Sequence, residues 1–364
     1  MIRIEKTLAF LFVLLFITQV TLAQDTVPQR VIWAVNKVDL GTILEEQGPQ
    51  VAEFEFTHTQ DSLYYIETVW SDCGCTDVEY TRDTLVVGES GKLQVTYDPT
   101  VGVGYFSRMI IVKGNLQGTQ DTLFIEGNAI PRSSNPERDY TTRKGKLGFR
   151  LEKVNMGEVF TNEPKLKAVE VYNFGEDIIY KDSLMFGGPE YIQVSQLTDS
   201  IMPNDRGLLQ VMYDGNMKGD LGYFEDRISL NWQDSSSFIH LDVLADVFEY
   251  YAPFAKDNLN VVPQLVLDPK EIDLSKIQAS EIQVENVVLR NAGRQILEIK
   301  KIQGNCDCLR LEIPKTTLDP GEMIELKVVF DPKGRKGIDQ RNIYIFSNDP
   351  VNPVQLLLLK SRVE

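Results

Sequence analysis

Short runs in which apolar and polar residues alternate recur along the whole chain. Residues 52–56 read Ala-Glu-Phe-Glu-Phe, residues 92–97 read Lys-Leu-Gln-Val-Thr-Tyr, and residues 343–346 read Ile-Tyr-Ile-Phe. Because a period of two places successive side chains on opposite faces of a strand, these runs predict β-strands. No long stretch keeps the period of about 3.6 residues that a helix needs, so we expect few and short helices. Turn residues separate the runs about every ten positions, a spacing typical of an immunoglobulin-like β-sandwich.

One short block of sequence returns three times at intervals of one domain length. It reads Val-Thr-Tyr-Asp at 95–98, Val-Met-Tyr-Asp at 211–214 and Val-Val-Phe-Asp at 328–331, so its final Asp residues lie 116 and 117 positions apart. Two further sets of landmarks keep this register: Gly41, Gly157 and Ser275 near each start, and the turn residues Gly88, Asn204 and Gly321. A repeat of this length indicates tandem domains. The sequence therefore predicts an all-β chain of three tandem immunoglobulin-like β-sandwich domains at 31–131, 147–249 and 264–364.

The two joins between these domains differ in composition. Residues 132–146 contain Pro, Ser, Gly and alternating charges, which is typical of a polar linker. The second join, from Tyr250 and Tyr251 through Phe254 to Pro263, is aromatic. We therefore expect the second and third domains to be docked more firmly than the first and second.

The N-terminus has the pattern of an export signal. Arg3 and Lys6 precede an apolar run at 8–20, and small residues follow at 21–23. A run of this length is shorter than the about 20 residues that a membrane span needs, so we expect a cleaved signal peptide at 1–23 in place of an anchor helix. No later apolar run is long enough to cross a bilayer. The predicted location is outside the cytoplasm, in the periplasm, at the cell surface or in the extracellular space.

Charge and histidine content narrow the possible functions. With 37 Lys and Arg against 53 Asp and Glu, the formal net charge is −16. The chain therefore lacks the basic surface that nucleic-acid binding requires. Two histidines and four cysteines leave few general bases and metal ligands. Because the sequence also lacks a Gly-x-Ser-x-Gly motif and a glycine-rich phosphate loop, we expect a protein that is not an enzyme and that uses no cofactor.

The four cysteines form two Cys-x-Cys pairs, Cys73 with Cys75 and Cys306 with Cys308, and the second cysteine of each pair stands 23 positions before the final Asp of its repeat. On a strand, residues i and i+2 point to one face with Cα atoms about 6.5 to 7 Å apart, at the upper edge of the disulfide range. A modest bend would let each pair close on itself. So short a ring contributes only about 1.6 kcal/mol through loop entropy. We therefore expect two local disulfides that shape a loop, and no bridge between domains.

Two other uses of these cysteines stay open. A strained, reducible pair could take part in thiol exchange, and two thiolates could hold Cu(I), whereas tetrahedral zinc would need two more ligands. His58 is the one nearby candidate ligand, and its register places it opposite Asn291 of the third repeat. A single histidine on a strand is more often a solvated side chain than a metal ligand, so we expect His58 to be solvated.

Motifs of the first and third repeats resemble known sandwich families. In the third repeat they are Asn-Ala-Gly at 291–293, Pro-Gly-Glu at 320–322, Phe-Asp-Pro at 330–332 and Ser-Asn-Asp-Pro-Val-Asn-Pro at 347–353. With them, this repeat resembles the sandwich domains of the major-sperm-protein, ASH and Hydin superfamily. With Asp-Cys-Gly-Cys-Thr at 72–76, the first repeat is similar to secreted bacterial immunoglobulin-like domains of unknown function that carry a Cys-Gly-Cys-Thr signature. The resemblance implies a sandwich fold and an envelope location, and it brings no catalytic activity.

The second repeat departs from this pattern, because Gly-Gly-Pro-Glu-Tyr at 187–191 stands where the cysteines would be. The whole sequence predicts a secreted, non-enzymatic scaffold, or an adhesion or interaction module, of the bacterial envelope. Sandwiches offer end loops and edge strands to ligands, so the expected partner is an envelope protein or a glycan, with its identity and the oligomeric state left open. The alternative is a thiol-redox or copper-binding protein that uses the Cys-x-Cys pairs.

Overall fold

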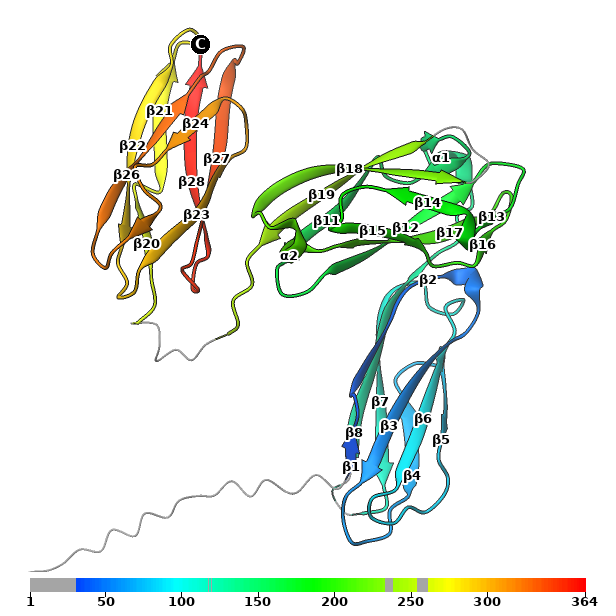
Figure 1. Cartoon of the computed structure of the whole chain (residues 1–364). Coiled ribbons are helices and arrows are strands. Elements are labelled where there is room, and N and C mark those ends of the chain that lie inside the picture. The colour runs from blue at the N-terminus through cyan, green and yellow to red at the C-terminus, as the bar shows by residue number, and fades with distance from the viewer. Residues whose placement is uncertain (1–30, 117, 119, 233–237, 254–260) are drawn as a thin grey trace, which may run out of the picture. The chain divides into compact units, whose positions relative to one another are not determined.

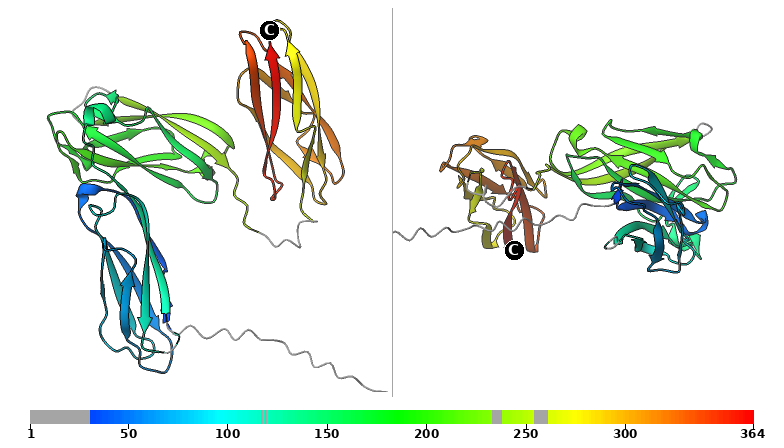
Figure 2. Two further views of the ribbon diagram at one scale, coloured as in Figure 1. Left: turned by 180° about the vertical axis from the view of Figure 1, so that it is seen from behind. Right: turned by 90° about the horizontal axis from the view of Figure 1, so that it is seen from below.

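A computed structural model describes residues 31–116, 118, 120–232, 238–253 and 261–364 of the chain. The chain divides into two compact units, Met1–Arg132 and Ser133–Glu364. The first unit holds one β-sandwich and the second holds two, called here the first, second and third sandwiches in chain order (Figures 1 and 2). The predicted signal peptide at 1–23 and Phe254 of the second join lie outside the described residues.

The first sandwich packs the sheet β1-β3-β6-β5 against the sheet β2-β8-β7-β4. Its elements are β1 (Val31–Trp33), β2 (Lys37–Leu44), a 3₁₀ turn (Glu45–Gln47), β3 (Gln50–His58), β4 (Ile66–Ser71), β5 (Thr76–Tyr80), β6 (Ser90–Tyr97), β7 (Gly104–Gly114) and β8 (Gln120–Ile130). Along β3 the apolar residues Ala52, Phe54 and Phe56 are buried, and the glutamates between them are exposed. The alternation in the sequence therefore decides which face of this strand meets the core.

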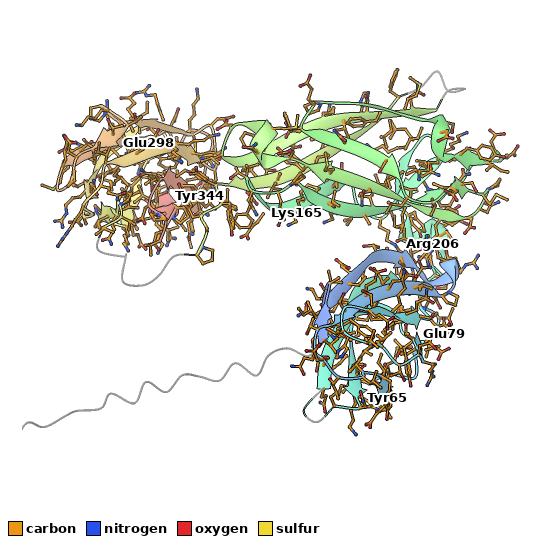
Figure 3. All side chains as sticks on the ribbon, turned by 60° about the horizontal axis from the view of Figure 1, so that its bottom comes forward. Tyr65, Glu79, Lys165, Arg206, Glu298 and Tyr344 are labelled. Atoms are coloured by element: carbon orange, nitrogen blue, oxygen red, sulfur yellow. A yellow bond between two sulfur atoms is a disulfide. The ribbon has the colours of Figure 1, made fainter. Side chains whose placement is uncertain are left out.

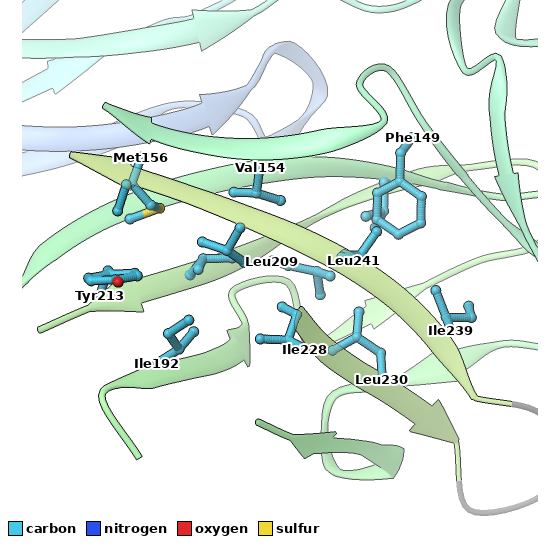
Figure 4. Close-up of a cluster of buried hydrophobic side chains, with 14 of the residues drawn as sticks. Phe149, Val154, Met156, Ile192, Leu209, Tyr213, Ile228, Leu230, Ile239 and Leu241 are labelled. Carbon is cyan, nitrogen blue, oxygen red and sulfur yellow. The ribbon is translucent and has the colours of Figure 1, made fainter. Parts of the chain in front are cut away.

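The second sandwich packs the sheet β15-β17-β12-β10-β9 against the sheet β11-β19-β18-β14, with β13 and β16 as an extra pair. Its elements are α1 (Pro136–Asp139), β9 (Thr142–Lys144), β10 (Leu147–Phe149), β11 (Lys153–Phe160), β12 (Lys165–Asn173), β13 (Ile179–Tyr180), a 3₁₀ turn (Lys181–Ser183), β14 (Leu184–Gly187), β15 (Ile192–Gln196), β16 (Ser200–Ile201), β17 (Arg206–Tyr213), α2 (Gly215–Lys218), β18 (Gly222–Trp232) and β19 (Ile239–Phe248). Side chains of both sheets meet in one core, where Leu209 and Tyr213 of β17 lie with Ile228 of β18 (Figure 4).

The third sandwich packs the sheet β20-β22-β26-β24 against the sheet β21-β28-β27-β23-β25. Its strands are β20 (Leu265–Asp268), β21 (Glu271–Ile277), β22 (Gln283–Asn291), β23 (Leu297–Gly304), β24 (Leu309–Glu312), β25 (Thr317–Leu318), β26 (Met323–Phe330), β27 (Gly337–Ser347) and β28 (Val354–Val363). The prediction of tandem immunoglobulin-like sandwiches with few and short helices is confirmed, because α1 and α2 have four residues each. Within the described ranges, no helix is long and apolar enough to cross a membrane.

The glycine or serine near the start of each repeat marks a bulge. In every sandwich the first long strand pairs in parallel with the last one, and the register shifts in the middle of that pairing. The shift falls at Gly41, Gly157 and Ser275, whose φ angles are 68°, 66° and 55°. A residue with positive φ bends the strand there and glycine adopts it at little cost, which explains why this landmark recurs.

A buried asparagine closes the same loop in the second and third sandwiches. Asn291, at the end of β22, is 0% exposed, and its amide donates to the carbonyls of Gln295 and Leu318 at 2.8 and 3.0 Å. Asn173, at the end of β12, is also 0% exposed and bonds two loop carbonyls in the same way. A polar side chain in this position ties two loops to the end of one strand.

His58 takes the place of that asparagine in the first sandwich. It ends β3, is 0% exposed, stacks on Tyr64 with ring centroids 5.4 Å apart, and its Nε2 bonds the carbonyl oxygen of Ser62. The predicted register with Asn291 is therefore right, but the interpretation of His58 as a solvated side chain is wrong. The strand ends under a loop that covers the ring, which the alternation along β3 alone does not reveal.

The interval predicted as a polar linker is in large part built into the second sandwich. Residues 142–144 form β9, which pairs with β10, and Tyr140 is 0% exposed. Tyr140 donates a hydrogen bond to Glu170 at 2.5 Å, and Arg150 and Arg206 bond the same carboxylate at 2.5 and 2.6 Å. The linker prediction for 132–146 is therefore wrong beyond its first few residues, because these polar side chains find partners in the fold.

Buried tyrosines predict a loss of stability in alkali. Burial raises the pKa of Tyr64 to about 12, and burial together with hydrogen bonds to carboxylates raises the pKa of Tyr140 and of Tyr213. Unfolded tyrosines ionise near pH 10. Above that pH the unfolded chain binds fewer protons than the native one, so stability present below pH 10 is lost as the pH rises. For Tyr64, which is 1% exposed, the loss amounts to about 2 to 3 kcal/mol by pH 12.

This expectation is checked by urea unfolding of the chain at increasing pH, with phenolate absorbance recorded alongside. The buried tyrosines should ionise only together with unfolding. Full phenolate formation near pH 10 with an unchanged urea midpoint would contradict it.

Candidate functional site

Each cysteine pair closes a small ring where a strand runs into the next. In the first sandwich the sulfur atoms of Cys73 and Cys75 are bonded, with Cα atoms 5.1 Å apart, between β4 and β5. The hydroxyl of Thr76 donates to the carbonyl of Cys73 at 2.9 Å, and the hydroxyls of Ser71 and Thr76 bond each other. Cys75 is 3% exposed and packs against the core, whereas Gly74 at the apex is exposed. The ring therefore sits at the sandwich surface with one side anchored.

The third sandwich repeats this arrangement between β23 and β24. Cys306 and Cys308 are bonded, again with Cα atoms 5.1 Å apart, and Asp307 stands exposed at the apex. Cys308 packs against the core, as Cys75 does in the first sandwich. The predicted Cys-x-Cys residues are thus brought together within each pair, and the two pairs belong to different sandwiches.

A backbone hydrogen bond explains the matched spacing of 23 residues. The amide of Asp98 donates to the carbonyl of Cys75 at 2.9 Å, and the amide of Asp331 donates to that of Cys308 at 2.9 Å. The Asp side chain then accepts from the amide two residues further on, in both sandwiches. Each ring is therefore fixed to the turn that follows β6 or β26, and the spacing reflects strand pairing.

The second sandwich fills the equivalent place with a polar cluster. Tyr191 supplies the carbonyl that accepts from the amide of Asp214 at 2.8 Å. The hydroxyls of Tyr191 and Tyr213 donate to Asp226 at 2.7 and 2.8 Å, and Lys218 bonds the same carboxylate at 3.0 Å. Burial lowers the pKa of Lys218, but its bonds to Tyr191 and Asp226 outweigh burial and raise it overall. The ring in the first and third sandwiches and the polar cluster in the second therefore hold the same loop against the same strand end. The cysteines have a structural role there that other residues can also fill.

Chemistry other than a disulfide finds little support around the rings. Among the described residues, no group of three or more His, Cys, Asp and Glu side chains lies close enough together to hold a metal ion. His58 packs against Tyr64 and Ser62 in its own loop. The copper and thiol-exchange alternatives would therefore have to use the two sulfur atoms of one ring without a further side-chain ligand from these residue types.

A protein contact surface lies on the outer face of the β23-β27 sheet, next to the Cys306–Cys308 ring. Within the second unit, the side chain of Gln303 accepts from the amide of Tyr223 at 2.9 Å and donates to its carbonyl at 3.1 Å. Tyr223 is the second residue of β18, and a Cβ atom on the preceding Gly222 would overlap Gln303. Phe248 of β19 and Phe346 of β27 stack with ring centroids 6.2 Å apart.

Charges of opposite sign meet around this contact. Lys301 bonds Asp220 at 2.9 Å, and Lys300 bonds Glu249. A cavity of about 550 Å³ opens beside these residues, and Tyr344 and the ring residue Cys306 are among those that line it. Tyr344 can be located on the third sandwich in Figure 3. The sheet face beside the ring is thus used to bind the end of another sandwich.

Comparison with family models matches both ring-bearing sandwiches. Residues 31–129 and 265–363 each match the family described as "Protein of unknown function (DUF1573)". The chain belongs to the DUF1573 family. The match leaves out the second sandwich, the repeat that has the polar cluster in place of a ring. The resemblance to a sandwich family of unknown function is confirmed at this level, and the family description names no activity for a DUF1573 domain.

Solved structures that are similar to this DUF1573 chain show low identity. A protein of unknown function from Porphyromonas gingivalis W83 covers 60% of the chain with all of its own, at 14% identity and a TM-score of 0.45. The I-band fragment I67–I69 of titin aligns 98% of its own length with 92% of the chain, at 10% sequence identity and a TM-score of 0.20. The Caenorhabditis elegans MSP family member WR4 aligns 97% of its own length with 28% of the chain, at 14% sequence identity and a TM-score of 0.21. No curated protein sequence matches.

Removal of a ring from a DUF1573 domain should have a small and local effect. We expect the double substitution Cys73→Ser and Cys75→Ser to lower the free energy of unfolding by no more than about 2 kcal/mol, because the ring it opens is short. Amide signals from Asp72 to Asp77 should shift, and those of the opposite sheet should not. A loss of the whole fold, or a peptide map that links Cys73 or Cys75 to Cys306 or Cys308, would contradict the local ring.

Proposed function

We propose that the chain is a non-enzymatic interaction module of the bacterial envelope, in which the sheet face beside each cysteine ring binds protein. The supporting observation is the contact of Gln303 with both backbone polar groups of Tyr223. A side-chain amide that bonds the main-chain N–H and C=O of a strand end can recognise that end whatever side chain it carries. A protein built from such sandwiches suits a scaffold or an adhesion module.

In this proposal the rings have a structural task. The Cys306–Cys308 ring follows Gln303 by a few residues, and its anchor to Asp331 holds the end of β23 in place. Loops carry function when a rigid scaffold fixes them. A disulfide gives that rigidity in an oxidising compartment, which agrees with the proposed export to the periplasm or the cell surface.

Crosslinking in intact cells with mass spectrometry tests the interaction module. A tagged full-length chain should yield crosslinked peptides to at least one envelope protein or to another copy of itself, and the linked lysines should lie near the sheet faces beside the rings. Recovery of the chain free of protein crosslinks, under conditions that link known neighbours in the envelope, would contradict the proposal.

A thiol and metal measurement separates this function from the competing class. The purified mature chain should contain no reactive thiol under denaturing conditions without reductant, and no stoichiometric copper. Cysteines that cycle between reduced and oxidised forms with a cellular redox partner, or one copper ion per ring, would move the function to thiol exchange or copper handling and leave the fold unchanged.

A further inference from the structure

The first sandwich carries, on the face that corresponds to the contact surface of the third, an exposed tryptophan. In β4 and β23 the register against the next strand shifts at the same point, after Ile66 and after Ile299. Four positions after these isoleucines, Trp70 pairs with Ile111 as Gln303 pairs with Tyr344. Trp70 therefore occupies the place of Gln303 in the first sandwich.

This surface, the Trp70 face, consists of Trp70, Met109, Ile111 and Phe124. Met109 and Ile111 point outward from β7, because Ile110 and Val112 between and beyond them are 0% and 1% exposed. Phe124 lies opposite Met109 on β8. Trp70 is 55% exposed and Phe124 is 36% exposed, which is costly for large apolar side chains that lie together. Tryptophan is also the residue type most enriched at binding hot spots.

The element that binds the matching face of the third sandwich also recurs. In β18 it is Gly222 with φ 104° followed by Tyr223. The corresponding strand β27 of the third sandwich begins with Gly337, with φ 86°, followed by Ile338. Ile338 is 89% exposed, and no residue of the described third sandwich covers it as Gln303 covers Tyr223. The tip, defined as residues 333–338, thus presents an apolar side chain at the position whose main chain makes the known contact in β18.

One charged position of the known contact has the opposite sign on the Trp70 face. There, the basic residues Lys300 and Lys301 of the face meet acidic residues of the second sandwich. On the Trp70 face, Glu67 takes the place of Lys300, held by Lys113 at 2.9 Å. The tip is basic, with Lys333 and Lys336 exposed. Glu67 at this position favours a basic tip over an acidic one.

We propose that the tip of the third sandwich in one copy binds the Trp70 face of the first sandwich in a second copy, so that copies assemble head to tail. This rests on the proposed function and names a second copy of the chain as the partner. The two surfaces differ, so the contact is heterologous and each added copy leaves one free face and one free tip. Assemblies larger than a dimer are the expected product, with an affinity that falls as salt screens the charges.

Sedimentation velocity of the full mature chain over a concentration series tests the assembly. The mean size should rise with concentration. Trp70→Ser and Ile338→Ser should each raise the dissociation constant at least about tenfold, because each removes an apolar anchor. Tyr105→Ser is the matched control, since Tyr105 holds the position of Ile338 in the first sandwich and is 73% exposed. It should leave the association unchanged.

Mixing the two variants gives the sharpest readout. Trp70→Ser retains an intact tip and Ile338→Ser retains an intact face, so the mixture should form pairs of one copy each and nothing larger. Circular dichroism of each variant shows whether it is folded. A wild-type chain that stays monomeric, or folded variants whose mixture does not pair, would overturn the head-to-tail contact. Crosslinks from the Trp70 face to a different envelope protein would in that case still support the proposed function.

Discussion

Replacement of Glu170 by alanine should lower the free energy of unfolding of the second sandwich by about 3 to 5 kcal/mol. The Glu170 side chain is 5% exposed and accepts from Tyr140, Arg150 and Arg206, and the Arg206 side chain is 2% exposed. Removing the carboxylate leaves the buried positive charge of Arg206 without this partner. The resulting loss of stability is far larger than the net stability that the intact ion pair contributes to the fold. Hydrogen exchange of the β12 and β17 amides should report the loss.

Arg227→Ala is the control in the same sandwich. Arg227 pairs with Asp242 at 2.8 Å, but its side chain is 69% exposed. Exposed pairs contribute at most about 1 kcal/mol, so this variant should change exchange rates little. Equal effects of Glu170→Ala and Arg227→Ala would show that residues 140–150 are not held by the buried carboxylate.

Replacement of His58 by alanine should destabilise the first sandwich by about 2 to 4 kcal/mol, whereas His58→Asn should cost less than half as much. Alanine leaves a cavity against Tyr64 and removes the bond to the Ser62 carbonyl. Asparagine is the residue that closes the same loop at positions 173 and 291, where it bonds two loop carbonyls.

Tryptophan fluorescence during urea unfolding checks this pair of variants, because Trp33 and Trp70 lie in the first sandwich. Equal destabilisation by alanine and asparagine would contradict the equivalence of His58 with the two asparagines. So would a His58→Ala protein as stable as the wild type.

Local rules were enough to predict the repeat architecture. Positions that need a positive φ, such as Gly88 and Gly321 with 86° and 84°, tolerate few residue types and are therefore visible in one sequence. The turn residue of the second repeat, Asn204, has φ 57°, as the register requires. The spacing of 23 residues from each ring to its Asp follows from strand pairing and is visible for the same reason.

Features that depend on partners across the fold were not predictable. The burial of Tyr140 depends on a carboxylate 30 positions away, so the local sequence with its charges predicts a linker instead. The outward direction of Trp70 depends on the register shift after Ile66, which no local pattern specifies. The contact of Gln303 with Tyr223 joins residues 80 positions apart in different sandwiches. The contact surface beside the Cys306–Cys308 ring is therefore not predictable from the sequence, although the ring itself is.

The claim that the sheet face beside a cysteine ring binds protein is tested most directly by a photo-crosslinking amino acid at position 70 of the full-length chain in cells. Irradiation should give covalent products with protein, and mass spectrometry should place them on the tip of another copy or on an envelope partner. Position 51, a valine that is 54% exposed on the opposite sheet, is the control and should give none. Absence of products from position 70, or equal products from both positions, would contradict the account.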